Sequence, residues 1–464
     1  MLRRTWWVPA VLWGIGAGWW MPRGPLTGTQ VVWSVVLSLA VGGLAGWASR
    51  SRWSMLIAPT VFWIAVEVLR LRVDGPSVDA PHASAFGFVT LIAGRGLQGL
   101  LSSLPMLLGA AYGAAVARSG GRFRRYVTAL VSAGVLVATV ALALPASTPP
   151  IPGPRSVAEL THVDANGHRL GLMIRGVDTA APVLLFVPGA PGGSERGGVR
   201  RHLAALEQRF VVVTLDRRGG GASYPALDPA ATVSPESEVG DIIAVTDQLR
   251  RRFGAEKIYL LGHSGGSVLS VLAVQRRPDL FRAYIGTGQG VDVRASDQIF
   301  YTDILAWARS TGRTDLARQL VAQGPPPYAD VYSYEPIMLH ENQAYGDETN
   351  AFADLDVPES TLLQKAHTIN ALLDTWSALY PRMQDVDLRR DAPRLEVPVY
   401  LVQGGREMRG LAVIFDQWYG QLQAPVKELT VLESSGHRAI FEEPDRFAAV
   451  LDRVLAETSG PPGR

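Results

Sequence analysis

The sequence predicts two fold classes in one chain, an all-α transmembrane domain followed by an α/β domain. Residues 1–146 hold long apolar runs broken by Arg, Gly and Pro, whereas residues 158–460 have the mixed charge of an ordinary soluble domain. In this second part strand-like and helix-like segments alternate, which is typical of a mostly parallel sheet with helices on both faces. Residues 147–157 are rich in Pro and predict a semi-rigid linker.

The first domain is expected to cross the membrane about five times. Its apolar runs approach the roughly 20 residues that a helix needs to span a bilayer; they lie at 28–48, 54–70, 97–117 and 126–145. A shorter run at 5–20 is flanked by Trp pairs, as expected at the two headgroup levels. The chain is therefore predicted to be an integral protein of the cell membrane that contacts the lipid bilayer.

Arginine placement predicts the orientation of these spans, because short loops rich in Lys and Arg stay on the cytoplasmic side. One Arg-rich loop precedes the last run and another, with Arg50 and Arg52, lies two runs earlier; the first contains Arg118, Arg122, Arg124 and Arg125. Both loops fall on the same side, so the last span exits outward. The α/β domain is expected to be extracytoplasmic.

The α/β domain is predicted element by element from hydrophobic patterning. Strands are expected at 159–163, 169–175, 183–187, 210–215, 257–262, 283–287, 397–402 and 427–432, and helices at 196–208, 235–253, 266–276 and 443–456. Between about 292 and 392 only helical patterns occur. Such an insertion predicts a lid over the carboxyl ends of the strands, where these sheets bind ligands.

The composition of the chain argues against several classes of function. The formal net charge is +2 and the α/β part has no basic block with interleaved aromatics, so we expect no nucleic-acid partner. The chain has no Cys, which excludes disulfides and a thiol nucleophile. It also lacks metal-ligand spacing and a Gly-rich nucleotide motif, and we expect neither a metal nor a cofactor.

The motif with the clearest chemistry is Gly262-His263-Ser264-Gly265-Gly266, which follows a strand and precedes a helix. This is the context of a nucleophile elbow, in which glycines flank the serine because the turn leaves no room for side chains. Ser264 is therefore predicted to be a nucleophile. The alternative is a Gly-rich turn whose serine merely caps the helix.

A serine nucleophile needs a base, and the base needs an orienting carboxylate; in this architecture the chain order is Ser, acid, His. His437 follows the last strand and is the predicted base, whereas His340 and His367 fall within the lid. Glu407 ends the preceding strand region and is the predicted acid, with Asp416 as its rival.

The developing oxyanion needs hydrogen-bond donors. One is predicted to be the N–H of Gly265, directly after the nucleophile. The second is expected from the loop after the third strand, "FVPGAPGGSE", where the N–H of Ala190 is the candidate.

Two further stretches carry a family resemblance. Residues 188–194 are similar to the H-G-G-P-G-G-S loop of proline iminopeptidases, and "DRRGGGAS" at 216–223 is similar to their D-x-R-G-x-G-x-S turn. Together with the serine motif, residues 158–457 resemble the proline iminopeptidase-like group of the α/β-hydrolase superfamily. Pro188, Ala190 and Glu407 stand where that family has His, Gly and Asp.

This resemblance implies an α/β-hydrolase fold with a helical lid and an aminopeptidase activity that needs no cofactor. Family members with that activity hold the free amino group of the substrate with acidic residues in or near the lid. Glu341, Asp347 and Glu348 are the candidates, and the alternative is a solvated acidic loop.

The expected function is a membrane-anchored serine hydrolase that cleaves an ester or amide bond of a small-molecule or peptide substrate. One alternative is a carboxylesterase or lipase that acts on esters near the membrane. An alternative of another class is a non-catalytic module that senses a ligand.

Overall fold

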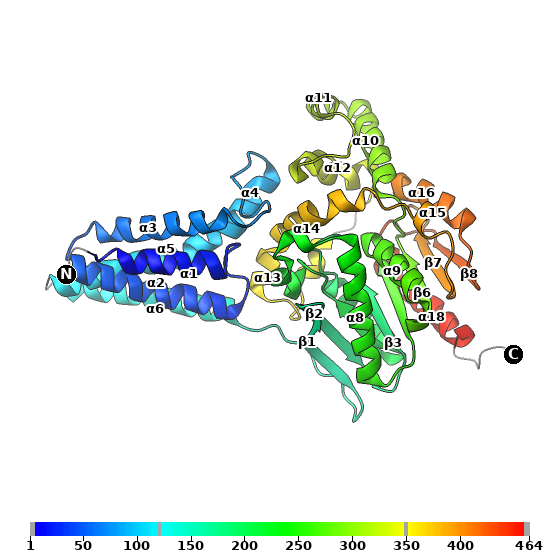
Figure 1. Ribbon diagram of the computed structural model, residues 1–464, viewed down its shortest axis with the longest axis horizontal. Coiled ribbons are helices and arrows are strands. Elements are labelled where there is room, and N and C mark those ends of the chain that lie inside the picture. The colour runs from blue at the N-terminus through cyan, green and yellow to red at the C-terminus, as the bar shows by residue number, and fades with distance from the viewer. Residues whose placement is uncertain (1–4, 119–121, 348–350, 459–464) are drawn as a thin grey trace. The chain divides into compact units, whose positions relative to one another are not determined.

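The structure is a computed structural model that describes residues 5–118, 122–347 and 351–458. The chain divides into two compact units (Figure 1). We call Met1–Ala146 with Thr361–Asn370 the helical unit, and Ser147–Ser360 with Ala371–Arg464 the sheet unit.

The helical unit has helices in all five predicted apolar segments. These helices are α1 (Val8–Trp20), α2 (Gly28–Ser49), α3 (Ser54–Arg70), α5 (Leu97–Ala117) and α6 (Arg122–Ala143). Helix α4 (Ala85–Leu91) and the π-helical turn η1 (Ile92–Gly96) directly precede α5, outside the predicted segments. Two helical stretches of the described chain, Gly28–Ser49 and Ala85–Ala117, are long and apolar enough to cross a membrane. The expected number of five spans stays a prediction.

Helices α2 and α5 approach closely through glycines spaced four residues apart. A side chain at Gly42 would lie 2.0 Å from the carbonyl oxygen of Met106, and one at Gly113 would lie 2.1 Å from that of Gly43. Small residues at this spacing let helix backbones touch, which is how helices pack where burial from water contributes little.

One segment of the predicted lid belongs to the helical unit. Helix α13 (Leu362–Ala366) buries Leu363 in an apolar cluster with Val31, Val35 and Leu101. The Nε2 atom of His367 lies 3.2 Å from the carbonyl oxygen of Pro25. The local pattern did not predict this membership, because Leu363 lies on a short helix and is buried by residues that are distant in the sequence.

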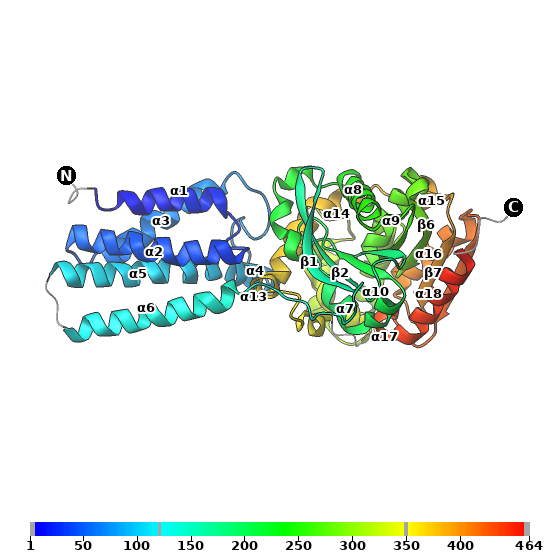
Figure 2. The same ribbon diagram turned by 90° about the horizontal axis from the view of Figure 1, so that it is seen from below.

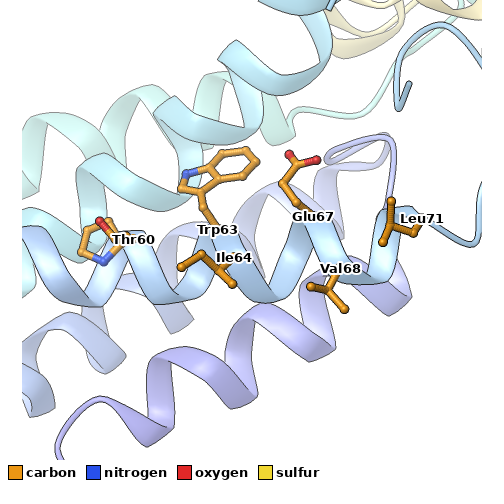
Figure 3. A pocket seen from close by; sticks show the side chains of 7 residues that line it. Thr60, Trp63, Ile64, Glu67, Val68 and Leu71 are labelled. Carbon is orange, nitrogen blue, oxygen red and sulfur yellow. The ribbon is translucent and has the colours of Figure 1, made fainter. Parts of the chain in front are cut away.

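A surface groove of about 620 Å³ runs along α3 (Figure 3). Trp63 and Glu67 extend from one side of the helix, and the lining residues all lie in α3 or directly after it: Pro59, Thr60, Trp63, Ile64, Glu67, Val68 and Leu71. Glu67 forms ion pairs with Arg70 at 2.5 Å and Arg95 at 3.2 Å. The groove is therefore a feature of the helical unit and is distinct from the residues predicted for catalysis.

The sheet unit confirms the predicted α/β architecture. Its eight strands are β1 (Val157–Ala165), β2 (His168–Gly176), β3 (Val183–Val187), β4 (Val211–Leu215), β5 (Ile258–His263), β6 (Phe281–Thr287), β7 (Val399–Gly404) and β8 (Lys427–Leu432). They form one sheet in the order β1-β2-β4-β3-β5-β6-β7-β8. The pairs β1–β2 and β2–β4 are antiparallel and the remaining neighbours are parallel, so the sheet is mostly parallel.

Helices cover both faces of this sheet (Figure 2). One face packs against α7 (Arg196–His202), the 3₁₀ turn η2 (Ala204–Gln208), α17 (Ala439–Glu442) and α18 (Pro444–Thr458). The other face packs against α8 (Pro235–Phe253) and α9 (Ser264–Arg276). Because β3, β4 and β5 are buried along their whole length, they read as continuous apolar runs rather than alternating patterns.

The described chain between β6 and β7 is helical, as the predicted lid requires. Its elements in the sheet unit are α10 (Val293–Ser310), α11 (Thr314–Gln323), η6 (Val331–Tyr334), α12 (Glu335–Tyr345), η7 (Ala351–Leu355) and α15 (Leu388–Asp391), and most of α14 (Thr368–Met383) joins them. Helices α10, α11 and α12 lie together in Figure 1. The last helix of this unit before β8 is α16 (Arg409–Gln421), and short 3₁₀ turns lie at η3 (Gly221–Leu227), η4 (Ala230–Thr232) and η5 (Pro278–Leu280).

The Pro-rich segment before β1 is bound rather than free at its start. The hydroxyl of Thr148 donates to the carboxylate of Glu359 at 2.9 Å, and Arg175 donates to the carbonyl oxygen of Pro149 at 2.8 Å. The start of this segment is therefore held by side chains from distant parts of the sheet unit.

Candidate active site

The predicted nucleophile lies at a sharp turn between β5 and α9. Ser264 has φ +49°, in the left-handed region that side chains other than glycine rarely adopt. A side chain at Gly266 would lie 2.2 Å from the carbonyl oxygen of Pro188, so this position accepts only glycine. Strained backbone that is held by close packing is typical of a nucleophile elbow.

The structure brings the three predicted catalytic residues together. His437 Nε2 lies 2.8 Å from Ser264 Oγ, and His437 Nδ1 lies 2.9 Å from Glu407 Oε1. Glu407 follows β7 and also accepts the backbone N–H of Met408 at 2.9 Å. Asp416, the rival acid, is exposed on α16.

The imidazole of His437 lies in a strongly acidic surrounding. Burial alone would lower its pKa, but the charge and hydrogen bond of Glu407, with the charges of Glu195 and Glu341, raise the pKa of His437 above 6.5. These carboxylates favour the imidazolium form of His437, which arises when the base takes the proton of the nucleophile.

The two predicted oxyanion donors belong to segments that contact each other. Gly265 is in the first turn of α9, where backbone N–H groups have no acceptor within the helix. Ala190 is exposed in the loop after β3. This loop runs against the elbow, because a side chain on the preceding Gly189 would lie 2.8 Å from the Cβ atom of Ser264.

The acidic lid residues have different surroundings. Glu341 is half-buried on α12; burial and the nearby carboxylates of Asp297 and Asp347 raise its pKa to about 7, against the opposing effect of His437. Asp347 lies near the loop of the predicted base, since a side chain at Gly436 would come within 3.6 Å of its Oδ2 atom. Glu348 lies outside the described residues.

Sequence reasoning missed Asp297, which is buried on α10. The hydroxyl of Tyr380 donates to Asp297 Oδ1 at 2.6 Å and the amide of Gln384 donates to Oδ2 at 3.1 Å. Burial raises the pKa of Asp297 to about 7, although these hydrogen bonds oppose the rise. The local helical pattern did not predict the burial and hydrogen bonds of Asp297, because its partners are about 80 residues away in the sequence.

Sequence reasoning also missed Glu195, which follows the Gly-rich loop. Both of its carboxylate oxygens lie within 2.9 Å of His263 Nδ1, and Oε2 accepts the N–H of Gly189 at 2.8 Å. Burial alone would raise the pKa of Glu195, but His263, the Gly189 N–H and Arg438 lower it to about 2. A second His–carboxylate pair therefore lies beside the first.

The described part of the chain contains no group of three or more His, Cys, Asp or Glu residues that could hold a metal ion. His340 is half-buried on α12, where its ring centroid lies 6.1 Å from that of Trp307, and His367 belongs to the helical unit.

Comparison with known proteins shows the family of this chain. A family model described as "alpha/beta hydrolase fold" matches residues 182–444. The chain is 30% identical over 311 residues to the probable aminopeptidase YbaC of Bacillus subtilis (strain 168), covering 65% of this chain and 98% of that protein. It is 24% identical over 277 residues to the putative carbamate hydrolase RutD of Enterobacter cloacae subsp. cloacae, covering 60% and 92% of the two chains. The crystal structure of a Mycobacterium smegmatis proline iminopeptidase aligns with TM-score 0.47 and 19% identity over 65% of this chain and 98% of that one.

Proposed function

Because this chain belongs to the α/β-hydrolase family, we propose that it is a membrane-anchored serine hydrolase that works through an acyl-enzyme on Ser264. The hydrogen-bonded series Ser264–His437–Glu407, with distances of 2.8 and 2.9 Å, carries this proposal. It meets the requirement of covalent catalysis for a nucleophile, a base in contact with it and a carboxylate that orients the base.

The reaction follows from these contacts. Ser264 Oγ attacks the carbonyl carbon of the substrate while His437 Nε2 takes the hydroxyl proton, and the oxyanion accepts hydrogen bonds from the N–H groups of Gly265 and Ala190. His437 then donates the proton to the leaving amine or alcohol, and the acyl-enzyme forms. Water attacks this ester, and the same proton transfers return the serine and release the acid.

For the leaving group we propose an amine, so that the enzyme removes an N-terminal residue. Two observations support this choice. The relative at 30% identity is a probable aminopeptidase, and the lid contains the carboxyl groups of Asp297 and Glu341. Glu341 lies close enough for its charge to act on His437. A carboxylate there would hold the free α-amino group of a peptide by a charge-assisted hydrogen bond.

Substrate pairs test this choice. We expect alanine and proline p-nitroanilides to be cleaved faster than their N-acetylated forms, because acetylation removes the charge that the carboxylates bind. Equal cleavage of both forms, with faster turnover of p-nitrophenyl esters, would favour the carboxylesterase or lipase function instead.

For the location we propose that the helical unit is a membrane anchor and that the sheet unit is extracytoplasmic. The two long apolar helices and the arginines of the short loops support this. A membrane-impermeant fluorophosphonate probe should label intact cells that carry the wild-type chain and should not label those that carry Ser264→Ala.

The outcomes of this labelling separate the parts of the proposal. Labelling only after lysis would overturn the orientation and keep the enzyme. No labelling under either condition would remove the support for a serine hydrolase and favour a sensing module, which would tolerate Ser264→Ala without change of phenotype.

A further inference from the structure

The two peptide groups that flank Gly189 are each held by a charged side chain. The Gly189 N–H donates to Glu195 Oε2 at 2.8 Å, and the Gly189 carbonyl oxygen accepts from Arg217 Nη2 at 2.8 Å. The side chain of Arg217 is 3% exposed and forms an ion pair with Glu238 at 3.3 Å. Gly189 directly precedes Ala190, whose N–H is the proposed oxyanion donor. Arg217 therefore holds the peptide group that carries the Ala190 N–H, and Glu195 holds the peptide group directly before it.

Glu195 also connects this loop to the nucleophile elbow. His263, which directly precedes Ser264, is 3% exposed and donates from Nδ1 to the carboxylate of Glu195. A side chain at Gly189 would lie 3.3 Å from His263 Nδ1. The loop, the carboxylate and the elbow are therefore in mutual contact.

The second nitrogen of His263 faces the loop of the proposed base. His263 Nε2 lies 3.5 Å from the backbone carbonyl oxygen of His437, and the two imidazole centroids are 5.4 Å apart. Phe441 packs edge-on against His263 with a centroid distance of 5.6 Å, which limits movement of the ring. His263 thus contacts the backbone of His437, and both ring nitrogens of His437 remain in contact with Ser264 and Glu407.

From these contacts we infer that Glu195 is a positioning residue for the proposed reaction. Its carboxylate holds the oxyanion loop, through the Gly189 N–H, against His263 of the elbow, and its negative charge stabilises His437 in the imidazolium form that arises during catalysis. This inference rests on the proposed serine hydrolase function. It assigns Glu195 no contact with the substrate.

Glu195 is one of several charged groups that act on the pKa of His437, so the experiment must distinguish its effect from theirs. The groups that face His437 are Glu407 from the loop after β7, Glu195 from the loop after β3 and Glu341 from α12, with His263 beside the ring. Asp347 and Glu442 lie near the adjacent Gly436, and Arg438 pairs with Asp354 at 2.6 Å. Removing the Glu195 charge leaves two carboxylates acting on His437, so the pKa of His437 should fall without losing all of its elevation.

The test measures the phosphonylation rate of Ser264 by a fluorophosphonate probe against pH, using the full chain in detergent. In Glu195→Gln we expect the rate at its pH plateau to fall by about 10²-fold, the size of effect seen when an oxyanion donor is lost. We also expect the acid limb of the pH profile to move to lower pH, because His437 must be neutral to accept the serine proton. A purely structural role for Glu195 would lower the rate without moving this limb.

Glu207→Gln is the matched control. Glu207 forms a buried ion pair with Arg175 at 2.7 Å in the same unit and is not among the groups that act on His437. It should cost stability, as breaking a buried pair does, yet leave the phosphonylation rate of the folded protein and its acid limb unchanged. Each rate is divided by the folded fraction measured at the same pH, so partial unfolding of either variant does not shift the limb.

The results separate the inference from the function on which it rests. Absence of wild-type labelling would refute the proposed function itself. Wild-type labelling with an unchanged acid limb and plateau in Glu195→Gln would overturn the positioning role alone, and so would an equal shift of the limb in Glu207→Gln.

Discussion

Two His–carboxylate pairs lie side by side in the sheet unit, and their comparison shows how one chemical unit can serve two purposes. In each pair Nδ1 of a buried imidazole faces a carboxylate, at 2.9 Å in Glu407–His437 and at 2.8 Å in Glu195–His263. The pairs differ in what the other ring nitrogen meets: Ser264 Oγ for His437, and a backbone carbonyl oxygen for His263. Only the first arrangement offers a base to a hydroxyl, so position rather than residue type separates the proposed catalytic pair from the positioning pair.

The carboxylates of the two pairs also have different surroundings. Glu195 accepts hydrogen bonds from a loop and from the elbow, so it joins two segments, whereas Glu407 serves His437 and the adjacent N–H of Met408. Loss of Glu195 should therefore disturb geometry, and loss of Glu407 should disturb proton transfer. The predictions below test this difference from the largest expected effect to the smallest.

Ser264→Ala should have the largest effect, because it removes the hydroxyl that donates to His437 and that distinguishes the His437 pair. We expect kcat for the substrate that wild type cleaves best to fall by about 10⁶-fold, as for nucleophile loss in other serine hydrolases. Steady-state hydrolysis with active-site titration measures this. Thermal unfolding should show no loss of stability, and a persistent rate near that of wild type would assign the chemistry to another residue.

Glu407→Gln should follow. An amide cannot stabilise the imidazolium and favours the wrong tautomer of His437, so we expect kcat to fall by about 10⁴-fold. The acid limb should also move to lower pH, because the carboxylate raises the pKa of His437. If Asp416→Asn gave the larger loss, the assignment of the acid would be wrong.

His263→Asn should have a smaller effect than either. The Asn amide can still donate to Glu195 from near the position of Nδ1, so the loop remains attached while the contact with His437 is lost. We expect a loss below the roughly 10²-fold proposed for Glu195→Gln. The double variant should lose less than the product of the single losses, since residues in one network do not act independently. Independent losses would show that the pair is not one unit.

Asp297→Asn should affect selectivity and stability more than the chemical step. The amide oxygen can still accept from Tyr380, and its NH2 can donate to Gln384 once the Gln384 amide turns over. We therefore expect ester cleavage to persist while cleavage of alanine p-nitroanilide declines. The ratio of the two rates reports this change. An equal decline of both rates would argue against an amine-binding role for Asp297.

The same variant should change the pH dependence of stability. The pKa of Asp297 is raised to about 7 from an ordinary value of 3.8, so the neutral carboxyl stabilises the native state at low pH and this contribution is lost as pH rises to about 7. Asn does not titrate, so the Tm of the variant relative to wild type should rise between acidic and alkaline pH, by about 2–4 °C for each kcal/mol that the wild type loses through Asp297. A constant difference across this range would contradict the raised pKa.

Local pattern was sufficient for much of the fold. All eight strands were predicted within a few residues, because strands buried on both faces form apolar runs that end at turn residues. The elbow around Ser264 was readable because its strained turn demands glycines at fixed offsets. The helical character of the segment between β6 and β7 was readable because this long stretch has no strand signal.

Long-range partners were not readable. Glu195 and His263 are 68 residues apart, and Asp297 and Tyr380 are 83 residues apart. Nothing in the local sequence of either pair predicts the contact. The membership of Thr361–Asn370 in the helical unit was missed for the same reason, since burial of Leu363 depends on residues of α2 and α5.

The sequence by itself determined the two fold classes, the strand positions, the elbow serine and the order of the residues proposed for catalysis, because these depend on periodicity and on backbone restrictions that act within a few residues. Only the tertiary structure decided which histidine faces the serine, which carboxylates surround it and what holds the oxyanion loop. Those features depend on distances between side chains from different elements, and folding sets these distances by packing many segments at once.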